Sequence, residues 1–332
     1  MATLNNTKLT YLDVANSLVD GKVETKIVEM LSQTNEMLTD AVVLPGNVQG
    51  GYKTIIRDGL PSSTFRELYR GVPPSKGRRV AVTETTCMLE ARSEVDKDIV
   101  DDPSELNSIR LSESFGFIES MSQTLQETLL YGNTDVQQAR FMGLTPRYNN
   151  LSSTAGLTNI INMSGSGNAN TSIWLVGWGE ETVFMCYPKG SKAGIVHEDL
   201  GEGEAYDDAN NPYRVYKDRW QIKTGLFVKD YRYAVRIGNI DAAALKADNA
   251  GTTGRILEAM LRSINRIPAI GACRPAFYVN RTVKEMIDIH AMNRSSNVLT
   301  LAEAAGQFHT RFMGIPIRLC DRISNNEANI AA

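Results

Sequence analysis

The most regular pattern of apolar positions along the chain lies between Pro103 and Tyr131. Apolar residues recur there at steps of three and four positions, the spacing of one face of a helix: Leu106, Ile109, Phe115, Ile118, Met121, Leu125 and Leu129. Asp102 suits the cap position, Glu105 that of a capping-box carboxylate, and a Gly-Asn pair follows the last turn. The pattern predicts a helix roughly 40 Å long, which is long enough to act as a strut across a flat molecule.

A different pattern precedes this helix. The segments VQGGYKTIIRDG and RRVAVTETTCMLEARSEV alternate apolar and polar residues, as strands do, around the turn-rich GVPPSKG at 71–77. The pattern predicts a long, charged β-hairpin over residues 48–92. Such a hairpin has little core of its own, so we expect it to need a partner surface.

The remaining segments mix helices with strands that resemble antiparallel ones. Residues 4–40 are predicted as short helices joined by an exposed arm, and the acidic stretch 197–213 as a solvated loop. Further strands are predicted in 171–190, 219–240, 275–280 and 314–323, and further helices at 252–266 and 281–293. Segregated helices and strands of this kind indicate an α+β fold. The length of 332 residues suits about two domains.

Composition excludes several classes of protein. Hydrophobic residues make up 42% and charged residues 22% of the chain, which is ordinary for a folded protein. The formal net charge is only −3, which argues against a chain-wide nucleic-acid binder. We find no signal peptide and no stretch of the roughly 18 apolar residues that a membrane span requires. We therefore expect a soluble protein that is made and used in a cytoplasm.

The distribution of charge carries more information than the total. Residues 51–92 sum to +4 and residues 93–127 to −7, so a basic block directly precedes an acidic one. Two solvated faces would explain this, and so would pairing within one molecule or between neighbouring copies. The candidates for contacts between subunits are Arg66, Arg70, Arg78 and Arg79 on the basic side, with Glu94, Asp96, Asp98, Asp101 and Asp102 on the acidic side.

The sequence shows no catalytic, metal or cofactor motif. The four cysteines are far apart and form no C-x-x-C pair, and the three histidines lack a metal-site spacing. The glycine-rich MSGSGNAN at 163–170 lacks the spacing of a phosphate-binding loop, and the acidic stretch 198–208 lacks that of a calcium loop. We expect neither an enzyme nor a bound cofactor.

Four motifs in order resemble those of tailed-bacteriophage major capsid proteins of the short-tailed type. LLYGNTDVQQARFMGLTPRYN, at the end of the predicted helix and after it, resembles the family's spine helix and following segment. The segments at 173–195 and 225–241 resemble its outer-domain strands. AFYVNRTVKEMIDIHAMN and FMGIPIRLCDRI resemble its C-terminal portion. The resemblance covers most of the chain and is densest from 112 to 240.

The resemblance implies the shell-forming fold that tailed phages share with herpesviruses and encapsulins. We expect an N-terminal arm at 1–47 and an extended β-loop at 48–102. A peripheral domain with the spine helix is expected at 103–165, with a C-terminal strand at about 312–330, and an axial domain at 166–311. Some members connect these strands in a permuted order, and the sequence leaves this open.

The function implied is that of a major capsid protein. Hexamers and pentamers of the chain would form the icosahedral head around double-stranded phage DNA, without sequence readout. The resemblance implies a separate scaffolding protein, a portal protein and a possible cement protein as partners, with assembly in the host bacterial cytoplasm. Lys53 and Lys76 lie where some members form a covalent crosslink, but we expect noncovalent contacts. The alternative is an encapsulin-like shell that encloses an enzyme.

Overall fold

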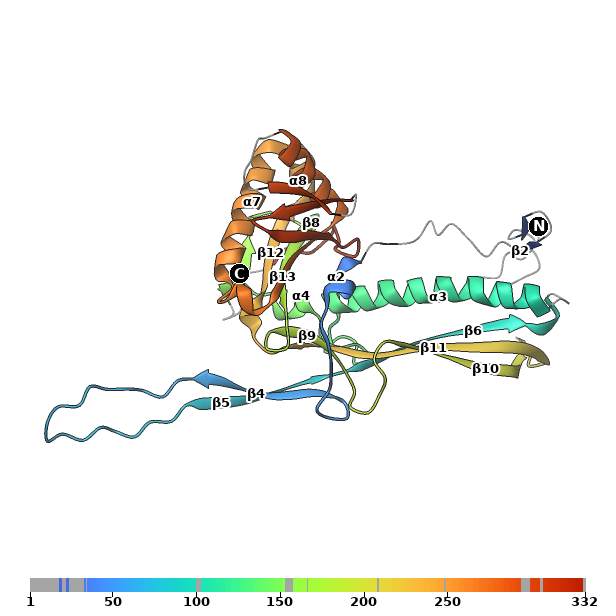
Figure 1. Cartoon of the computed structure of the whole chain (residues 1–332), viewed down its shortest axis with the longest axis horizontal. Coiled ribbons are helices and arrows are strands. Elements are labelled where there is room, and N and C mark those ends of the chain that lie inside the picture. The colour runs from blue at the N-terminus through green and yellow to red at the C-terminus, as the bar shows by residue number, and fades with distance from the viewer. Residues whose placement is uncertain are drawn as a thin grey trace.

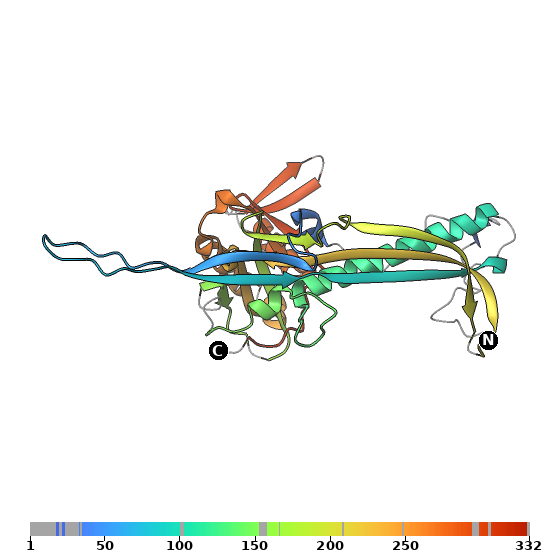
Figure 2. The ribbon, with the colours of Figure 1, turned by 90° about the horizontal axis from the view of Figure 1, so that it is seen from below.

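The protein consists of a sheet-and-helix body from which two long elements extend in opposite directions (Figures 1 and 2). The computed structural model describes residues 18–19, 22–23, 33, 35–99, 103–152, 158–165, 167–207, 209–247, 249–293, 299–304 and 307–330. Their mixture of helices and strands confirms the predicted α+β class.

The body is built around strand β8 (Asn170–Trp178), all of whose residues are buried. β8 lies between the antiparallel strands β12 (Ala234–Asp241) and β13 (Arg274–Val279), with β9 (Val183–Tyr187) following it along the sheet. The sheet continues through the smaller strands β3 (Val43–Pro45), β7 (Ile160–Asn162), β14 (Leu299–Ala304), β15 (Gln307–Phe312) and β16 (Ile315–Leu319). Side chains such as Trp174 and Phe277 fill the main core.

Helices cover this sheet. α6 (Ala242–Ala247) and α7 (Asn249–Arg266) pack against β12, and α8 (Arg281–Asn293) packs against β16. α2 (Glu36–Asp40) and α4 (Leu144–Arg147) are short helices beside the sheet. The predicted helices at 252–266 and 281–293 are confirmed, the first beginning at Asn249. Strands β14 and β15 and helix α6 were not predicted.

One extension is the long helix α3 (Pro103–Tyr131) with a three-stranded ribbon beside it. β11 (Pro212–Val228) is the middle strand, and β6 (Cys87–Asp96) and β10 (Ile195–Tyr206) pair with it in antiparallel fashion. The bounds of α3 match the prediction. The predicted apolar residues, however, do not all lie on one buried face. Leu106, Ile109, Met121, Leu125 and Leu129 are buried, whereas Phe115 and Ile118 lie on an exposed face.

The other extension is the hairpin of β4 (Gly51–Gly59) and β5 (Arg78–Thr85), connected by a long tip at 60–77. After Thr86 the chain continues into β6, which pairs with β11 of the ribbon. The 3-10 turn η1 (Lys97–Ile99) directly follows β6 at the far end of the ribbon. Of the predicted arm, the structure describes β1 (Leu18–Val19), β2 (Lys22–Val23), Gln33 and the residues from Asn35 onward.

The acidic stretch predicted as a loop at 197–213 is largely strand β10 and the start of β11. Opposite charges on adjacent strands explain the difference, since cross-strand ion pairs stabilise a sheet. Arg219 on β11 contacts Glu198 on β10 at 3.2 Å, and Lys97, in the turn that follows β6, contacts Glu202 at 2.9 Å. β10 and the start of β11 lie along α3 and away from the body (Figure 1).

Candidate assembly surfaces

The hairpin tip, residues 60–77, exposes large apolar side chains that no other described part of the chain covers. Phe65 and Tyr69 are fully exposed and Leu68 is 88% exposed. The contacts that shape the tip are local: the Ser75 hydroxyl donates to the Ser62 carbonyl at 2.8 Å. Exposed apolar groups gathered in this way mark an interaction surface.

The base of the hairpin, in contrast, is firmly attached to the body. The Tyr52 ring packs edge-on against Phe184 at 5.1 Å between centroids and also contacts Phe227. Glu84 on β5 forms an ion pair with Arg147 of α4. The hairpin is therefore held out from the body in a fixed direction.

The four candidate arginines all lie in this hairpin. In the tip, the Arg66 Nε donates to the Arg70 carbonyl at 2.9 Å, and Arg70 forms an exposed ion pair with Glu67 at 3.3 Å. Arg78 and Arg79 are exposed at the start of β5. Surface ion pairs of this kind contribute little stability, so these charges can take new partners.

The described acidic candidates lie at the far end of the ribbon. Glu94 on β6 is exposed and its Oε1 lies 3.4 Å from the Lys217 Nζ. Asp96 accepts a 3.0 Å hydrogen bond from the backbone N–H of Asp98, which belongs to η1. Asp101 and Asp102 lie outside the described residues, as does the predicted cap of α3. Both views place this end of the ribbon opposite the hairpin tip (Figures 1 and 2).

Ion pairs also link the strands of the ribbon. Arg219 lies between Glu90 on β6, at 2.7 Å, and Glu198 on β10. The hydrogen bond from Arg219, together with one from Arg92, lowers the pKa of Glu90 to about 2. The three strands are thus connected through charged side chains.

Between α3 and the ribbon lies a polar cluster that the sequence did not indicate. Asp218 is 4% exposed and accepts two hydrogen bonds from Arg110, at 2.8 and 2.9 Å. The His197 Nε2 lies 2.9 Å from the same carboxylate, and the His197 ring stacks on Trp220. Arg110 and Asp218 are 108 positions apart, so no local motif could reveal the pair.

This cluster forms one wall of a groove of about 490 Å³. Its apolar lining comes from Leu111 and Ile118 of α3 and from Ile195 of β10. Phe115 lies on the same exposed face of the helix and is 53% exposed. The groove and this face together offer an apolar surface beside the acidic ribbon end.

Among the described residues, no three or more His, Cys, Asp or Glu side chains gather as they would to hold a metal ion. The described helices include none with the length and apolar character needed to cross a membrane. The four cysteine thiols are free. Burial raises the pKa of Cys186 and of Cys320 to about 12, so these two thiols are poor nucleophiles near neutral pH.

Comparison with known proteins identifies the family of this chain. A family model described as major capsid protein GP7 matches residues 19–331. The chain belongs to this family. It is a shell-forming capsid protein, a structural component of the virion.

Solved phage capsids have the same fold as this capsid protein. A bacteriophage Epsilon15 structure is 29% identical, with a TM-score of 0.78, over 100% of both chains. The capsid of bacteriophage JBD30 is 9% identical, with a TM-score of 0.53, over 94% of this chain and 98% of that one. An encapsulin complex from Synechococcus elongatus is 11% identical with a TM-score of 0.43, over 67% and 92%. None of the curated proteins compared with the chain matches it.

These findings confirm the family, the fold and the shell-forming function that the sequence motifs implied. Between the two shells considered, they support the phage capsid over the enzyme-filled compartment. The arginine and acidic candidates remain predictions.

Proposed function

We propose that this capsid protein assembles into hexamers and pentamers that close an icosahedral head around double-stranded DNA. The observation that carries the proposal is the uncovered hairpin tip, because a soluble subunit gains stability by burying Phe65, Leu68 and Tyr69 against a neighbour. The near-balanced net charge of −3 suits a shell that encloses DNA without reading its sequence.

In this proposal the hairpin of one subunit lies over the ribbon and α3 of another. Its basic residues, Arg66, Arg70, Arg78 and Arg79, meet the acidic ribbon end at Glu94, Asp96, Asp98, Asp101 and Asp102. The exposed face of α3, with Leu111, Phe115 and Ile118, supplies apolar surface for the tip. Charge would set the register of the contact and apolar burial would supply most of its free energy.

The shape of the subunit favours contacts between subunits over contacts within one. The hairpin points away from the body on one side, and the described acidic residues lie at the end of the opposite extension (Figure 1). Tyr52 and the Glu84–Arg147 ion pair hold the hairpin base against the body. The tip therefore has to find its partner on another copy.

Charge reversal tests the pairing. One variant reverses the four arginines to glutamate, a second carries Glu94→Lys and Asp96→Lys, and a third combines both sets. We expect either set alone to abolish closed shells in electron micrographs and the combination to restore them. Arg262→Glu with Glu258→Lys, an exposed ion pair on α7, is the control and should assemble normally.

Because Glu94 also contacts Lys217 within the subunit, thermal unfolding of each unassembled variant checks that the fold is retained. Normal assembly of either single set would show that the proposed pairing is wrong.

We further propose a separate scaffolding protein, a portal protein and a possible cement protein as partners, with assembly in the host bacterial cytoplasm. For the domains we propose the arm at 1–47, the extended loop at 48–102, the peripheral domain at 103–165 with about 312–330, and the axial domain at 166–311. Expression with and without the neighbouring genes, followed by electron microscopy, tests the partners. Identical closed shells under both conditions would contradict a required scaffold.

A further inference from the structure

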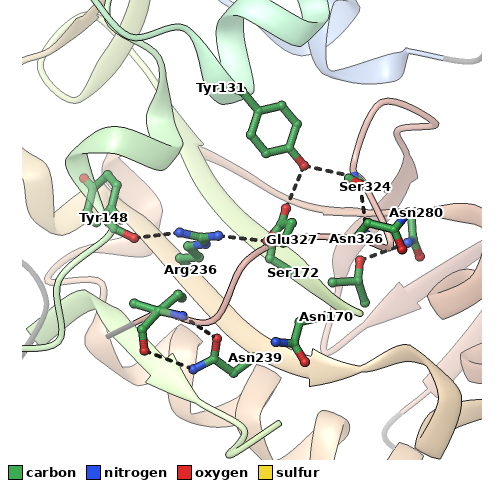
Figure 3. Close-up of polar contacts among 12 residues, drawn as sticks. Tyr131, Tyr148, Asn170, Ser172, Arg236, Asn239, Asn280, Ser324, Asn326 and Glu327 are labelled. Carbon is green, nitrogen blue, oxygen red and sulfur yellow. Dashed lines mark hydrogen bonds and ion pairs between the residues drawn. The ribbon is translucent and has the colours of Figure 1, made fainter. Parts of the chain in front are cut away.

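A buried polar cluster joins the C-terminal strap, residues 324–330, to the body and to the end of α3 (Figure 3). Glu327 is 7% exposed and Arg236 is 2% exposed, and the two form an ion pair at 2.8 Å. Arg236 also donates to the Tyr148 carbonyl at 2.9 Å. The other carboxylate oxygen of Glu327 accepts hydrogen bonds from Tyr131, at 2.6 Å, and from Ser172, at 2.9 Å.

The strap is fixed to the sheet along its length. The backbone N–H of Glu327 donates to the Asn170 carbonyl at 2.8 Å, and the backbone N–H of Ile330 donates to the Asn239 side chain at 2.9 Å. The Ile330 side chain is buried over Gly238. The strap therefore behaves as part of the body.

Tyr131 is the point where α3 meets this strap. It is the last residue of α3, and its hydroxyl donates to Glu327 and accepts a 2.9 Å hydrogen bond from the Ser324 backbone N–H. Burial and the Glu327 carboxylate raise the pKa of Tyr131 well above its usual value, so the hydroxyl keeps the proton that it donates. Both hydrogen bonds connect the helix end to the strap.

Contacts that fix the orientation of α3 at Tyr131 matter because the helix is long, so that a small change of angle there displaces its far end. Leu125, Leu129 and Leu130 bury its last turns in the core, and because the hydrophobic effect is itself non-directional, the hydrogen bonds of Tyr131 add an orientation-dependent contact. The helix is roughly 40 Å long at 1.5 Å per residue, so a tilt of about 5° at Tyr131 moves the far end by roughly 3–4 Å. The ribbon is carried along with it.

We infer that Tyr131 and Glu327 are positioning residues that set the angle between α3 and the body, and through it the curvature of the shell. Arg236 keeps Glu327 in place, since removing the carboxylate would leave a buried cation without a counter-charge. The hydrogen bond from Tyr131 to Glu327 then fixes the end of α3 relative to the strap. The inference rests on the proposed contacts between the ribbon and a neighbouring subunit.

Tyr131→Phe is the decisive variant, because it removes both hydrogen bonds and leaves the Arg236–Glu327 ion pair intact. We expect folded subunits whose melting temperature falls by no more than about 4 °C. Their shells should lose the single diameter of the wild type in electron micrographs and show a broad or shifted size distribution.

Tyr278→Phe is the matched control. Its hydroxyl is also buried in the body and bonded to two groups, Trp178 and Asp40, but neither belongs to α3. We expect a similar small loss of melting temperature with shells of wild-type diameter. Glu327→Gln leaves Arg236 without its counter-charge and no longer holds the group that accepts from Tyr131, so it should lower the melting temperature more and also broaden or shift the diameters.

Shells of wild-type diameter from Tyr131→Phe would overturn the inference and leave the shell function intact. Failure of Tyr131→Phe to fold would overturn it as well, because the hydroxyl would then serve the fold alone. Failure of the wild-type protein to form shells under any condition would instead contradict the proposed function.

Discussion

At the scale of single residues, the ribbon concentrates carboxylates whose ionised form is stabilised by a neighbouring cation. Glu90 is the clearest case, with a pKa lowered to about 2 by hydrogen bonds from Arg219, Arg92 and Gln221. Hydrogen bonds from the Gly201 backbone and from Arg110 also lower the pKa of Asp199, and those from Lys97 and Tyr216 lower that of Glu202. Each of these groups favours the folded ribbon only while it is ionised.

We predict that the unassembled subunit loses stability as pH falls from about 4.5 towards 2. The folded-state pKa of Glu90 lies below its unfolded value of about 4.5, so its contribution is complete above that value and is lost as the carboxylate is protonated. Urea unfolding at a series of pH values measures this. Glu90→Gln should show a smaller loss across that window than the wild type.

Glu285→Gln, which changes an exposed carboxylate on α8, is the control and should follow the wild-type profile. An unchanged profile for Glu90→Gln would show that its ion pairs do not stabilise the ribbon.

The sequence gives the three histidines, among them His197, no metal-site spacing, and it indicates no role for Arg110 or Asp218. These residues meet only because β10, β11 and α3 pack together, with Asp218 buried under the pair. Local spacing carries no signal for contacts across more than a hundred positions. The family motifs, by contrast, are continuous stretches of sequence, and they identified the function without these residues.

At the scale of elements, helices were predicted well because their apolar spacing is local. α3 has the predicted bounds, but periodicity could not show that Phe115 and Ile118 stay exposed in the isolated subunit. Strands were predicted less well because a strand depends on its partner. The continuous alternation through 78–95 conceals the change of partner at Thr86, which separates β5, paired with β4, from β6, paired with β11.

The hairpin base offers an element-scale test at Gly51. A Cβ at this position would lie 1.9 Å from the Glu84 carbonyl oxygen, and the φ angle of 154° is one that other residues rarely adopt. We predict that Gly51→Ala displaces the hairpin base and lowers the free energy of unfolding by about 1–3 kcal/mol. Urea unfolding measures the loss, and assembly should fail because the hairpin points in a new direction.

Gly50→Ala is the neighbouring control, since a Cβ there has no heavy atom within 4 Å. Equal effects of the two variants would contradict the role given to the close approach at Gly51.

At the scale of the whole molecule, stability and assembly reside in different places. The core lies in the body, around β8 and β13, whereas the tip and the exposed face of α3 add apolar surface that the isolated subunit leaves in water. A change confined to the tip should therefore alter assembly without unfolding the subunit.

We predict this outcome for a variant in which residues 60–77 are replaced by Asn-Gly. Gly59 and Arg78 are paired across the hairpin, so a two-residue turn can join them. The shortened loop should leave the subunit at least as stable in urea as the wild type, because a shorter loop costs less entropy to close. Electron microscopy should show no closed shells. Wild-type shells from this variant would show that the tip is dispensable.

The late position of the strap in the sequence also affects when the body can complete its folding during synthesis at the ribosome. Arg236 is translated 91 residues before Glu327, which supplies its counter-charge. At about 5–20 residues per second, roughly 5–20 s pass between the synthesis of Arg236 and that of Glu327, and during this time the cation lacks its counter-charge. A polypeptide that ended before Glu327 would lack the carboxylate and keep a buried cation without its counter-charge. The body of the subunit therefore reaches its full set of contacts only after the strap has been translated.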